Sequence, residues 1–258
     1  MRMRAKRLEH TVFLLVGVSI AAVVLAAVNR LEQRGAASPA TRAAPGASRR
    51  FRIPLGNVVI AKARVPRVTV YTWPNRRPKV VLPNPNAQGG RLVFLVDWTH
   101  PVWTWPSWVR VYVPARPNGN TGWIRASQVT FLLDPFRVVV RLREHTLQVL
   151  KAARPYVTTP IGVGRAVTPT PVGRYYLVEL IITHQPNGLY GPFAFGTSAF
   201  SNVLTSFGGG PGQIGIHGTN YPQGIGTDVS HGCIRMPNAI ITRLAHVLPL
   251  GTPVDIVR

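Results

Sequence analysis

The residues best suited to covalent chemistry are Cys233 and two nearby histidines, His217 and His231. Cys233 is the only cysteine of the chain, so it cannot form an intramolecular disulfide. A neighbouring histidine can accept the thiol proton or stabilise the thiolate as an imidazolium, which lowers the pKa of the cysteine. Gly232 allows a positive φ, so that successive backbone N–H groups could point at one oxygen. These residues predict a cysteine acyl-transfer site with a backbone oxyanion hole.

The sequence around these residues resembles the catalytic domain of the YkuD-type L,D-transpeptidases of bacterial cell-wall assembly. The resemblance extends over residues 134–258, and its His to Ser-His-Gly-Cys arrangement is specific enough to make chance a poor explanation. Signatures of other cysteine-protease families are absent. Three stretches carry the resemblance: Ile216-His217-Gly218-Thr219, Ser230-His231-Gly232-Cys233-Ile234-Arg235-Met236 and Leu250-Gly251-Thr252-Pro253-Val254.

The resemblance implies that Cys233 is the nucleophile and His217 its base. It also implies that the backbone carbonyl of Gly218 orients the imidazole in place of a carboxylate. The sequence agrees in one respect, because Asp228 is the only acidic residue between positions 180 and 254. A carboxylate that oriented the imidazole would have to be Asp228 or come from a distant part of the chain.

The resemblance further implies that the N–H groups of His231, Gly232 and Cys233 surround the developing oxyanion. On this interpretation the His231 side chain shapes the wall of the site and does not act as the base. Arg235 has two interpretations that the sequence leaves open. It could be a cation that faces a substrate carboxylate, or it could form a structural ion pair or backbone clamp.

Four more residues are expected to contact substrate. Ser230 and Thr219 belong to the motifs that carry the catalytic residues. Tyr190 and Phe195 lie between residues 183 and 212, a stretch rich in Gly, Pro, Ser and aromatic residues with little periodicity. A loop this long within a compact domain is usually a lid or a binding loop. The resemblance implies that this loop covers the acyl-donor site.

The predicted reaction is two-step covalent catalysis. The resemblance implies that the Cys233 thiolate attacks the carbonyl of the third residue, an L-centred diamino acid, in a tetrapeptide stem of peptidoglycan. The terminal D-Ala leaves, and the side-chain amine of a neighbouring stem then forms a 3→3 cross-link. It also implies inactivation by carbapenems and no cofactor. The alternatives are an L,D-carboxypeptidase, if water replaces the amine, and a non-catalytic protein that binds the cell wall.

A zinc site is the main competing chemistry. His217, His231 and Cys233 could supply three ligands, and His184 could add a fourth. The sequence has neither a second cysteine nor a His-x-x-x-His pair, and a glycine beside the cysteine suits an oxyanion hole better than a ligand cage. The prediction is therefore that the chain binds no metal here.

The chain is strongly basic. It carries a formal net charge of +22, with 30 Lys and Arg residues against 8 Asp and Glu. Such a surface favours polyanions: nucleic acid, anionic lipid or anionic wall polymers. The basic residues are scattered among apolar positions, and no nucleic-acid-binding signature is present. We therefore expect wall polymers and not nucleic acid as the anionic partner.

Residues 1–30 predict a short cytoplasmic tail and a single transmembrane helix. Basic residues precede the uncharged run from Thr11 to Val28, which as a helix would rise about 27 Å, enough to span a bilayer core. The basic N-terminal side predicts that the rest of the chain lies outside the cell membrane, in the cell envelope. The alternative is a signal peptide cleaved within residues 35–48, which would make the protein secreted.

Two further regions precede the catalytic half. Residues 31–54 are rich in Ala, Gly, Ser, Pro and Arg and predict a flexible linker. Residues 55–132 contain short alternating apolar runs separated by turn residues, which predicts a small antiparallel β-barrel or sandwich. Its last stretch, residues 122–129, resembles the end of bacterial SH3-like domains. All six tryptophans lie in this region, where they could bind glycan or, as is more common, pack in the interior.

The catalytic half, residues 134–258, is predicted to be a β-sandwich of the L,D-transpeptidase type with one C-terminal helix. Apolar runs at residues 137–142 and 146–150 predict a hairpin. Apolar residues on one helical face predict a helix within residues 237–248, stopped by Pro249. Residues 252–257 predict a last strand. The overall fold class is therefore mainly β.

Overall fold

A computed structural model of the chain describes residues 53–97 and 107–258. The predicted tail and anchor, residues 1–30, and nearly all of the predicted linker, residues 31–54, lie outside the described residues. Trp98, Trp103 and Trp105 also lie outside them. Within the described ranges, no helix combines the length and the apolar character needed to cross a bilayer. The described residues all belong to one compact unit of the chain.

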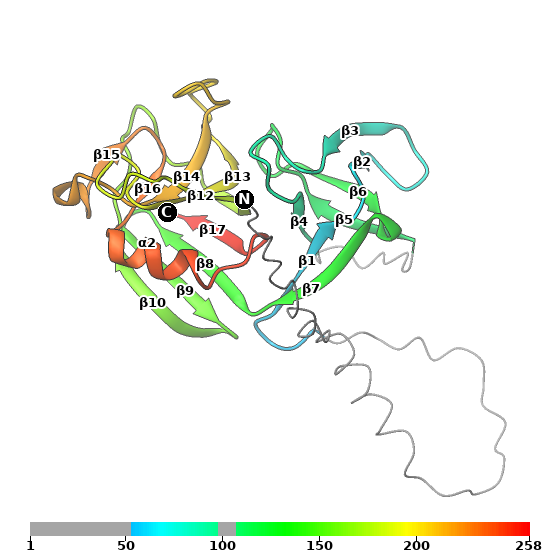
Figure 1. Cartoon of the computed structure of the whole chain (residues 1–258), viewed down its shortest axis with the longest axis horizontal. Helices are drawn as coiled ribbons and strands as arrows, with labels where there is room; N and C mark the ends of the chain where they lie inside the picture. Colours follow the sequence, from blue (N-terminus) through cyan, green and yellow to red (C-terminus); the bar gives the residue numbers. More distant parts are fainter. Residues whose placement is uncertain (1–52, 98–106) are drawn as a thin grey trace, which may run out of the picture. The chain divides into compact units, whose positions relative to one another are not determined.

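Residues 58–134 form two small antiparallel sheets, with strand orders β4-β1-β7 and β3-β2-β6-β5 (Figure 1). Val68 and Val70 alternate along β2 and are fully buried, packing in one cluster with Ile124 of β6. The predicted short antiparallel strands are present, whereas the likeness to SH3-like domains stays a prediction. The elements are β1 Val58–Ala63, β2 Arg67–Tyr71, β3 Pro78–Pro83, β4 Val93–Leu95, β5 Trp108–Tyr112, β6 Thr121–Arg125, the 3-10 turn η1 Ala126–Gln128 and β7 Val129–Asp134.

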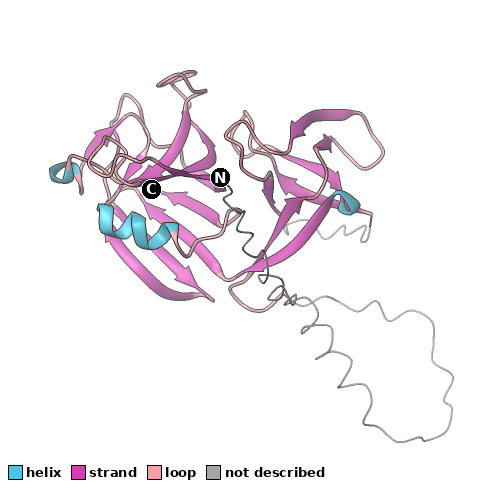
Figure 2. Ribbon diagram, viewed as in Figure 1, coloured by secondary structure: helices cyan, strands magenta, loops and turns pink. Residues whose placement is uncertain are grey.

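Residues 136–257 form an eight-stranded sheet of order β10-β9-β8-β17-β12-β13-β14-β16 and a two-stranded sheet of β11 and β15. Figure 2 shows how far strands predominate, with α2 as the one α-helix of the described residues. The elements are β8 Phe136–Arg141, β9 Thr146–Lys151, β10 Arg154–Pro160, β11 Val163–Gly164, β12 Gly173–Ile182, β13 Phe193–Phe200, β14 Gln213–His217, the 3-10 turn η2 Pro222–Gly224, β15 Asp228–Ser230, β16 Ile234–Arg235, α2 Asn238–Ala245 and β17 Pro253–Val257.

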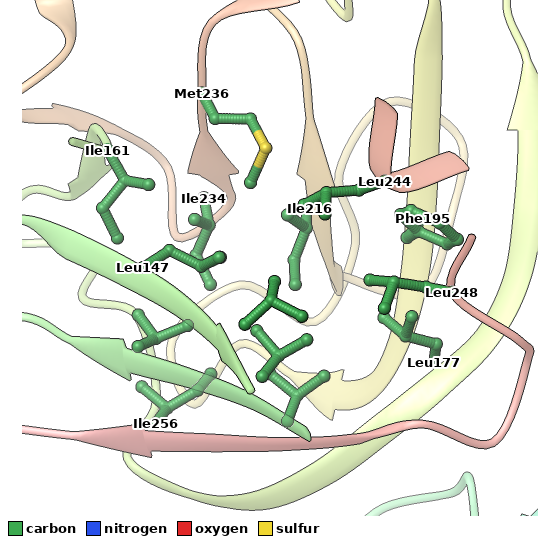
Figure 3. Packing of buried hydrophobic residues seen from close by; sticks show 14 of the residues in the cluster. Leu147, Ile161, Leu177, Phe195, Ile216, Ile234, Met236, Leu244, Leu248 and Ile256 are labelled. Atoms are coloured by element: carbon green, nitrogen blue, oxygen red, sulfur yellow. The ribbon is translucent and has the colours of Figure 1, made fainter. Parts of the chain in front are cut away.

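Strand β12 makes this sheet into a sandwich. Its first residues, 173–176, pair with β17, and residues 177–182 pair with β13, with a register shift between Leu177 and Glu179. A bulge of this kind bends a strand and increases its twist. Leu147 of β9 and Ile234 of β16, which lie near opposite ends of the strand order, consequently belong to one buried cluster (Figure 3). The expectation of a mainly β fold with one helix near the C-terminus is confirmed.

The expectation of one long loop between residues 183 and 212 was wrong. Strand β13 occupies residues 193–200 and pairs with both β12 and β14. Six of its eight residues are buried, so the strand has no alternation of polar and apolar residues. Two shorter loops, residues 183–192 and 201–212, remain on either side of it.

The two sets of sheets meet through buried contacts. The Tyr176 hydroxyl lies 3.3 Å from the carbonyl oxygen of Val93 and 3.2 Å from that of Tyr112. Gly251 has φ of 101°, and a Cβ added to it would lie 1.9 Å from Cγ2 of Ile60. No strand pairing joins the two sets of sheets among the described residues, and the change from one to the other falls between β7 and β8. The domain boundaries 55–132 and 134–258 stay a prediction.

Candidate active site

His217 is the last residue of β14 and is 2% exposed. Its Nδ1 lies 2.6 Å from the backbone carbonyl oxygen of Gly218. A carbonyl oxygen can only accept a hydrogen bond, so Nδ1 carries the ring hydrogen and Nε2 of the neutral imidazole keeps its lone pair. The carbonyl thus fixes the tautomer that a carboxylate fixes in Ser-His-Asp triads.

Cys233 directly precedes β16, which pairs in parallel with the end of β14. Ile216 and Ile234 lie opposite each other in this register, and both enter the core (Figure 3). The N–H of Gly215 points at Sγ of Cys233 from 3.4 Å. A Cβ added to Gly215 would lie 3.7 Å from Cδ2 of His217 and 3.8 Å from this Sγ. The imidazole edge and the thiol therefore both lie close to the backbone at Gly215, which has no side chain to separate them.

Burial determines the protonation states of this pair. It lowers the pKa of His217 from 6.5 to about 4; the positive charge of Arg235 acts in the same direction, and the hydrogen bond to Gly218 opposes both. Burial raises the pKa of the Cys233 thiol, although the N–H of Gly215 and the charge of Arg235 favour the thiolate. The expectation that histidine lowers the cysteine pKa was therefore wrong. At neutral pH the pair rests as a thiol and a neutral imidazole.

The turn before Cys233 is held by Ser230 and by Gly232, whose φ is 121°. Ser230 Oγ accepts the N–H of Gly232 at 3.0 Å and donates to the carbonyl of Cys233 at 2.5 Å. Thr170 Oγ1 donates to the Gly232 carbonyl at 2.8 Å. Ser230 is 1% exposed and uses its hydroxyl within the turn. It therefore positions the nucleophile, and the geometry does not support the expected contact with substrate.

The backbone N–H groups of this turn do not all remain available. Gly232 N–H is taken by Ser230 Oγ. Among the described residues, the N–H groups of His231 and Cys233 have no hydrogen-bond acceptor. These two amides, and not the expected three, are free to bind an oxyanion. The His231 ring is exposed and lies 5.2 Å from the ring of Phe207.

The ring of Tyr190 packs against that of His217, and its expected contact with substrate stays a prediction. The two ring centroids are 4.8 Å apart at an interplanar angle of 70°, and Tyr190 is 40% exposed. Phe195 does not lie over the histidine. It belongs to β13 and is 1% exposed in the core. Its expected contact with substrate is not supported.

Thr219 also lies within the protein framework. Its N–H donates to Oδ1 of Asn238 at 2.7 Å, and its own Oγ1 accepts the N–H of Tyr221 at 3.0 Å. It is 4% exposed, so the expected substrate contact is not supported. The Asn238 Nδ2 donates to the carbonyl of Pro186 at 3.2 Å. Asn238 thereby ties the loop that carries Tyr190 to the turn after the base, a role that no sequence signal indicated.

Arg235 lies opposite His217 in the β14–β16 register. Its Nε is buried without a hydrogen-bond partner, and no described acidic side chain lies within ion-pair distance of it. Its charge favours the neutral form of His217 and the thiolate form of Cys233. The described part of the chain therefore does not contain the structural ion pair that the sequence left open. Arg235 is instead a cation next to the reacting groups.

The residues weighed for zinc do not come together as a ligand set. In the described part of the chain, no group of three or more His, Cys, Asp or Glu side chains has an arrangement that could hold a metal ion. Asp228, the acid nearest in sequence, instead lies 2.8 Å from Nε2 of His145.

Comparisons with known proteins give one consistent result. A family model for the L,D-transpeptidase catalytic domain, YkuD, matches residues 135–256. The chain is 36% identical over 149 residues to a Bacillus licheniformis protein that bears, provisionally, the name L,D-transpeptidase YkuD; the match covers 55% of this chain and 82% of that protein. A protein of Bacillus subtilis with the same name is 36% identical over 124 residues, covering 48% of this chain and 67% of its own length.

The comparison with solved structures also gives matches. One is an L,D-transpeptidase from Mycobacterium tuberculosis H37Rv, which is 18% identical with a TM-score of 0.41. That match covers 54% of this chain and 72% of the other.

Proposed function

The chain belongs to the L,D-transpeptidase family, and from this premise we propose that it forms 3→3 cross-links in peptidoglycan through an acyl-enzyme on Cys233. One observation carries the proposal. The thiol and the imidazole edge both lie within 4 Å of the position that a Cβ on Gly215 would take, and the Gly218 carbonyl holds the imidazole in the tautomer that can accept a proton. A thiol with an imidazole base on the neighbouring strand has the arrangement of a nucleophile that a general base activates.

In the first step, Nε2 of His217 takes the proton of the Cys233 thiol as the sulfur attacks the carbonyl carbon of the third stem residue. The resting pair is neutral, so His217 acts as a general base during the attack. The negative charge on the carbonyl oxygen is stabilised by the N–H groups of His231 and Cys233, the amides that the turn leaves free. The bond to D-Ala then breaks, and its amine leaves with the proton from His217.

In the second step, the side-chain amine of a neighbouring stem attacks the thioester carbonyl. His217 accepts the amine proton and returns it to the sulfur as the new amide forms and the thiol is released. Tyr190, over the imidazole, keeps water from the base, which favours the amine over hydrolysis. Arg235 supplies the cation that a carboxylate of the stem would meet.

We place this activity outside the cell membrane. The basic tail and apolar run within residues 1–30 support an anchor with the catalytic half in the cell envelope. The high positive charge supports retention by anionic wall polymers.

The test is release of D-Ala from tetrapeptide stems by the full chain, together with Cys233→Ala. We expect D-Ala release and cross-linked dimers from the unaltered chain and neither product from the variant. Intact-mass measurement after incubation with a carbapenem should show one covalent adduct, which the variant lacks. D-Ala release with only free tripeptide would favour the L,D-carboxypeptidase. Unchanged release by Cys233→Ala would refute the cysteine mechanism.

A further inference from the structure

The loop between β13 and β14, residues 201–212, contacts His231, two residues before the proposed nucleophile; we call it the Phe207 loop. The ring of Phe207 lies tilted over that of His231, at 5.2 Å and an interplanar angle of 31°. Phe207 is 43% exposed, and His231 is exposed two residues before Cys233. The stacked pair therefore forms a surface wall beside the thiol.

Both ends of this loop are held by one arginine from the N-terminal sheets. The guanidinium of Arg116, which lies between β5 and β6, donates to the carbonyl of Ser201 at 2.7 Å and to that of Leu204 at 3.0 Å. It also donates to the carbonyl of Pro211 at 3.1 Å. Ser201 and Leu204 lie where the chain leaves β13, and Pro211 lies shortly before β14. The guanidinium therefore links the two ends of the loop. A planar fork of five donors can do this, whereas an ammonium group has no matching geometry.

A neighbouring side chain fixes where the loop begins. The Asn118 amide accepts the N–H of Phe200 at 2.8 Å and donates to the carbonyl of the same residue at 2.7 Å. It also reaches Oδ1 of Asn202 at 3.0 Å. The side chain thus mimics a strand partner for the last residue of β13. Arg116 adds to this contact by lying 5.1 Å from the centre of the Phe200 ring.

Within residues 53–97 and 107–258, the other hydrogen bonds of the Phe207 loop are internal to it, and its ring contact is the one with His231. Its tip is closed by Phe207 and Gly210, which exchange backbone hydrogen bonds at 2.9 and 3.0 Å. Ser201 Oγ accepts the N–H groups of Val203 and Leu204 within the loop itself. These contacts shape the loop without setting its direction. The direction depends on the hydrogen bonds at its base, since a loop pivots about its ends.

We propose that the N-terminal sheets position the Phe207 loop, and through it the His231 wall of the active site, by means of Arg116 and Asn118. The N-terminal region is then a working part of the catalytic site in addition to any role in wall binding. Arg116 is a positioning residue, because it touches no reacting atom. The inference rests on the proposed function for its kinetic test and has an independent structural test in the motion of the loop.

The experiment compares Arg116→Gln, Asn118→Ala and Arg116→Lys with Arg67→Gln in the full chain. Arg67→Gln is the matched control because it removes the same charge from an exposed position at the start of β2. Hydrogen–deuterium exchange reports on residues 201–212. Kinetics of D-Ala release, acylation by a carbapenem and alkylation by iodoacetamide report on the site.

For Arg116→Gln and Asn118→Ala, we expect amide exchange in the loop to rise about tenfold or more. Both kcat/KM and carbapenem acylation should fall about ten- to a hundredfold, because both need the His231 wall beside the thiol. Iodoacetamide should react at the wild-type rate, because β14 and β16 still hold the thiol and the base. Arg116→Lys should fall between wild type and Arg116→Gln, and Arg67→Gln should match wild type.

Two results would overturn the proposal. One is loop exchange in Arg116→Gln equal to that in Arg67→Gln. The other is faster exchange with stem turnover and carbapenem acylation both unchanged. Exchange in β14 identifies any variant that is merely unfolded, in which case Arg116→Lys and Asn118→Ala carry the test. Failure of the cysteine mechanism would be visible separately, as D-Ala release by Cys233→Ala.

Discussion

Replacing the buried base should make the protein less sensitive to acid. His217 is neutral in the folded protein down to about pH 4, whereas in the unfolded chain it binds a proton below about pH 6.5. Between these values the unfolded state holds one more proton than the native state at this residue. Stability therefore falls as the pH falls through this window.

The magnitude follows from the two pKa values. A difference of about 2.5 units corresponds to about 3 kcal/mol when the pH is well below 4. At pH 5, relative to pH 7.5, the loss due to His217 is about 2 kcal/mol. Because the side chain is only 2% exposed, solvent screening reduces this value little. His217→Gln has no proton to gain, so it should lack this part of the pH dependence.

The assay is denaturant unfolding of wild type, His217→Gln and His217→Asn at pH 7.5, 6 and 5. Carboxylates contribute equally to all three proteins, so the difference between wild type and the variants isolates His217. We expect the variants to gain about 2 kcal/mol relative to wild type between pH 7.5 and pH 5, whatever their stability at pH 7.5. Parallel curves for wild type and both variants would mean that the imidazole is not buried in its neutral form, and would refute the reasoning.

Three more substitutions test particular contacts. Gly215→Ala places a methyl group in ordinary van der Waals contact with both the imidazole and the thiol, so unfolding should be unchanged and kcat/KM should fall by less than about tenfold; a larger loss would show that the two reacting groups move into this space during the reaction. Tyr190→Ala lets water reach His217, so the acidic limb of the rate profile, set near pH 4 by the pKa of His217, should move to higher pH; an unmoved limb would contradict the shielding role. Gly251→Ala combines a positive φ with a clash against Ile60, so chemical denaturation should show a loss of at least about 2 kcal/mol; a loss below about 0.5 kcal/mol would show that the junction is loosely packed.

The sequence predicted Cys233 as nucleophile, His217 as base and the Gly218 carbonyl as its orienting group, and the structure has the predicted contact between the His217 ring and this carbonyl. This prediction was possible because Cys233 is the single cysteine and because Gly218 and Gly232 stand within short motifs that also contain the two histidines. Alternation of apolar residues also predicted the hairpin of β8 and β9, and helical spacing predicted α2. It failed for β13, which is buried on both faces and so has no alternation to detect.

Roles that depend on long-range contacts could not be predicted from sequence. Ser230, Thr219 and Phe195 belong to the expected site by position, yet burial turns their side chains toward the framework. The side chains of Asn238 and Arg116 belong to no motif, and their hydrogen bonds to Thr219 and Ser201 join residues that are 19 and 85 positions apart.

The chain sequence by itself determined which atoms can react, because a thiol, an imidazole and flexible glycine backbone are properties of residue type and local spacing. The tertiary structure alone decided their protonation. Loss of solvent around the pair raises the thiol pKa and lowers the imidazole pKa, whereas the charge of Arg235 favours both the thiolate and the neutral imidazole; no local pattern encodes these surroundings.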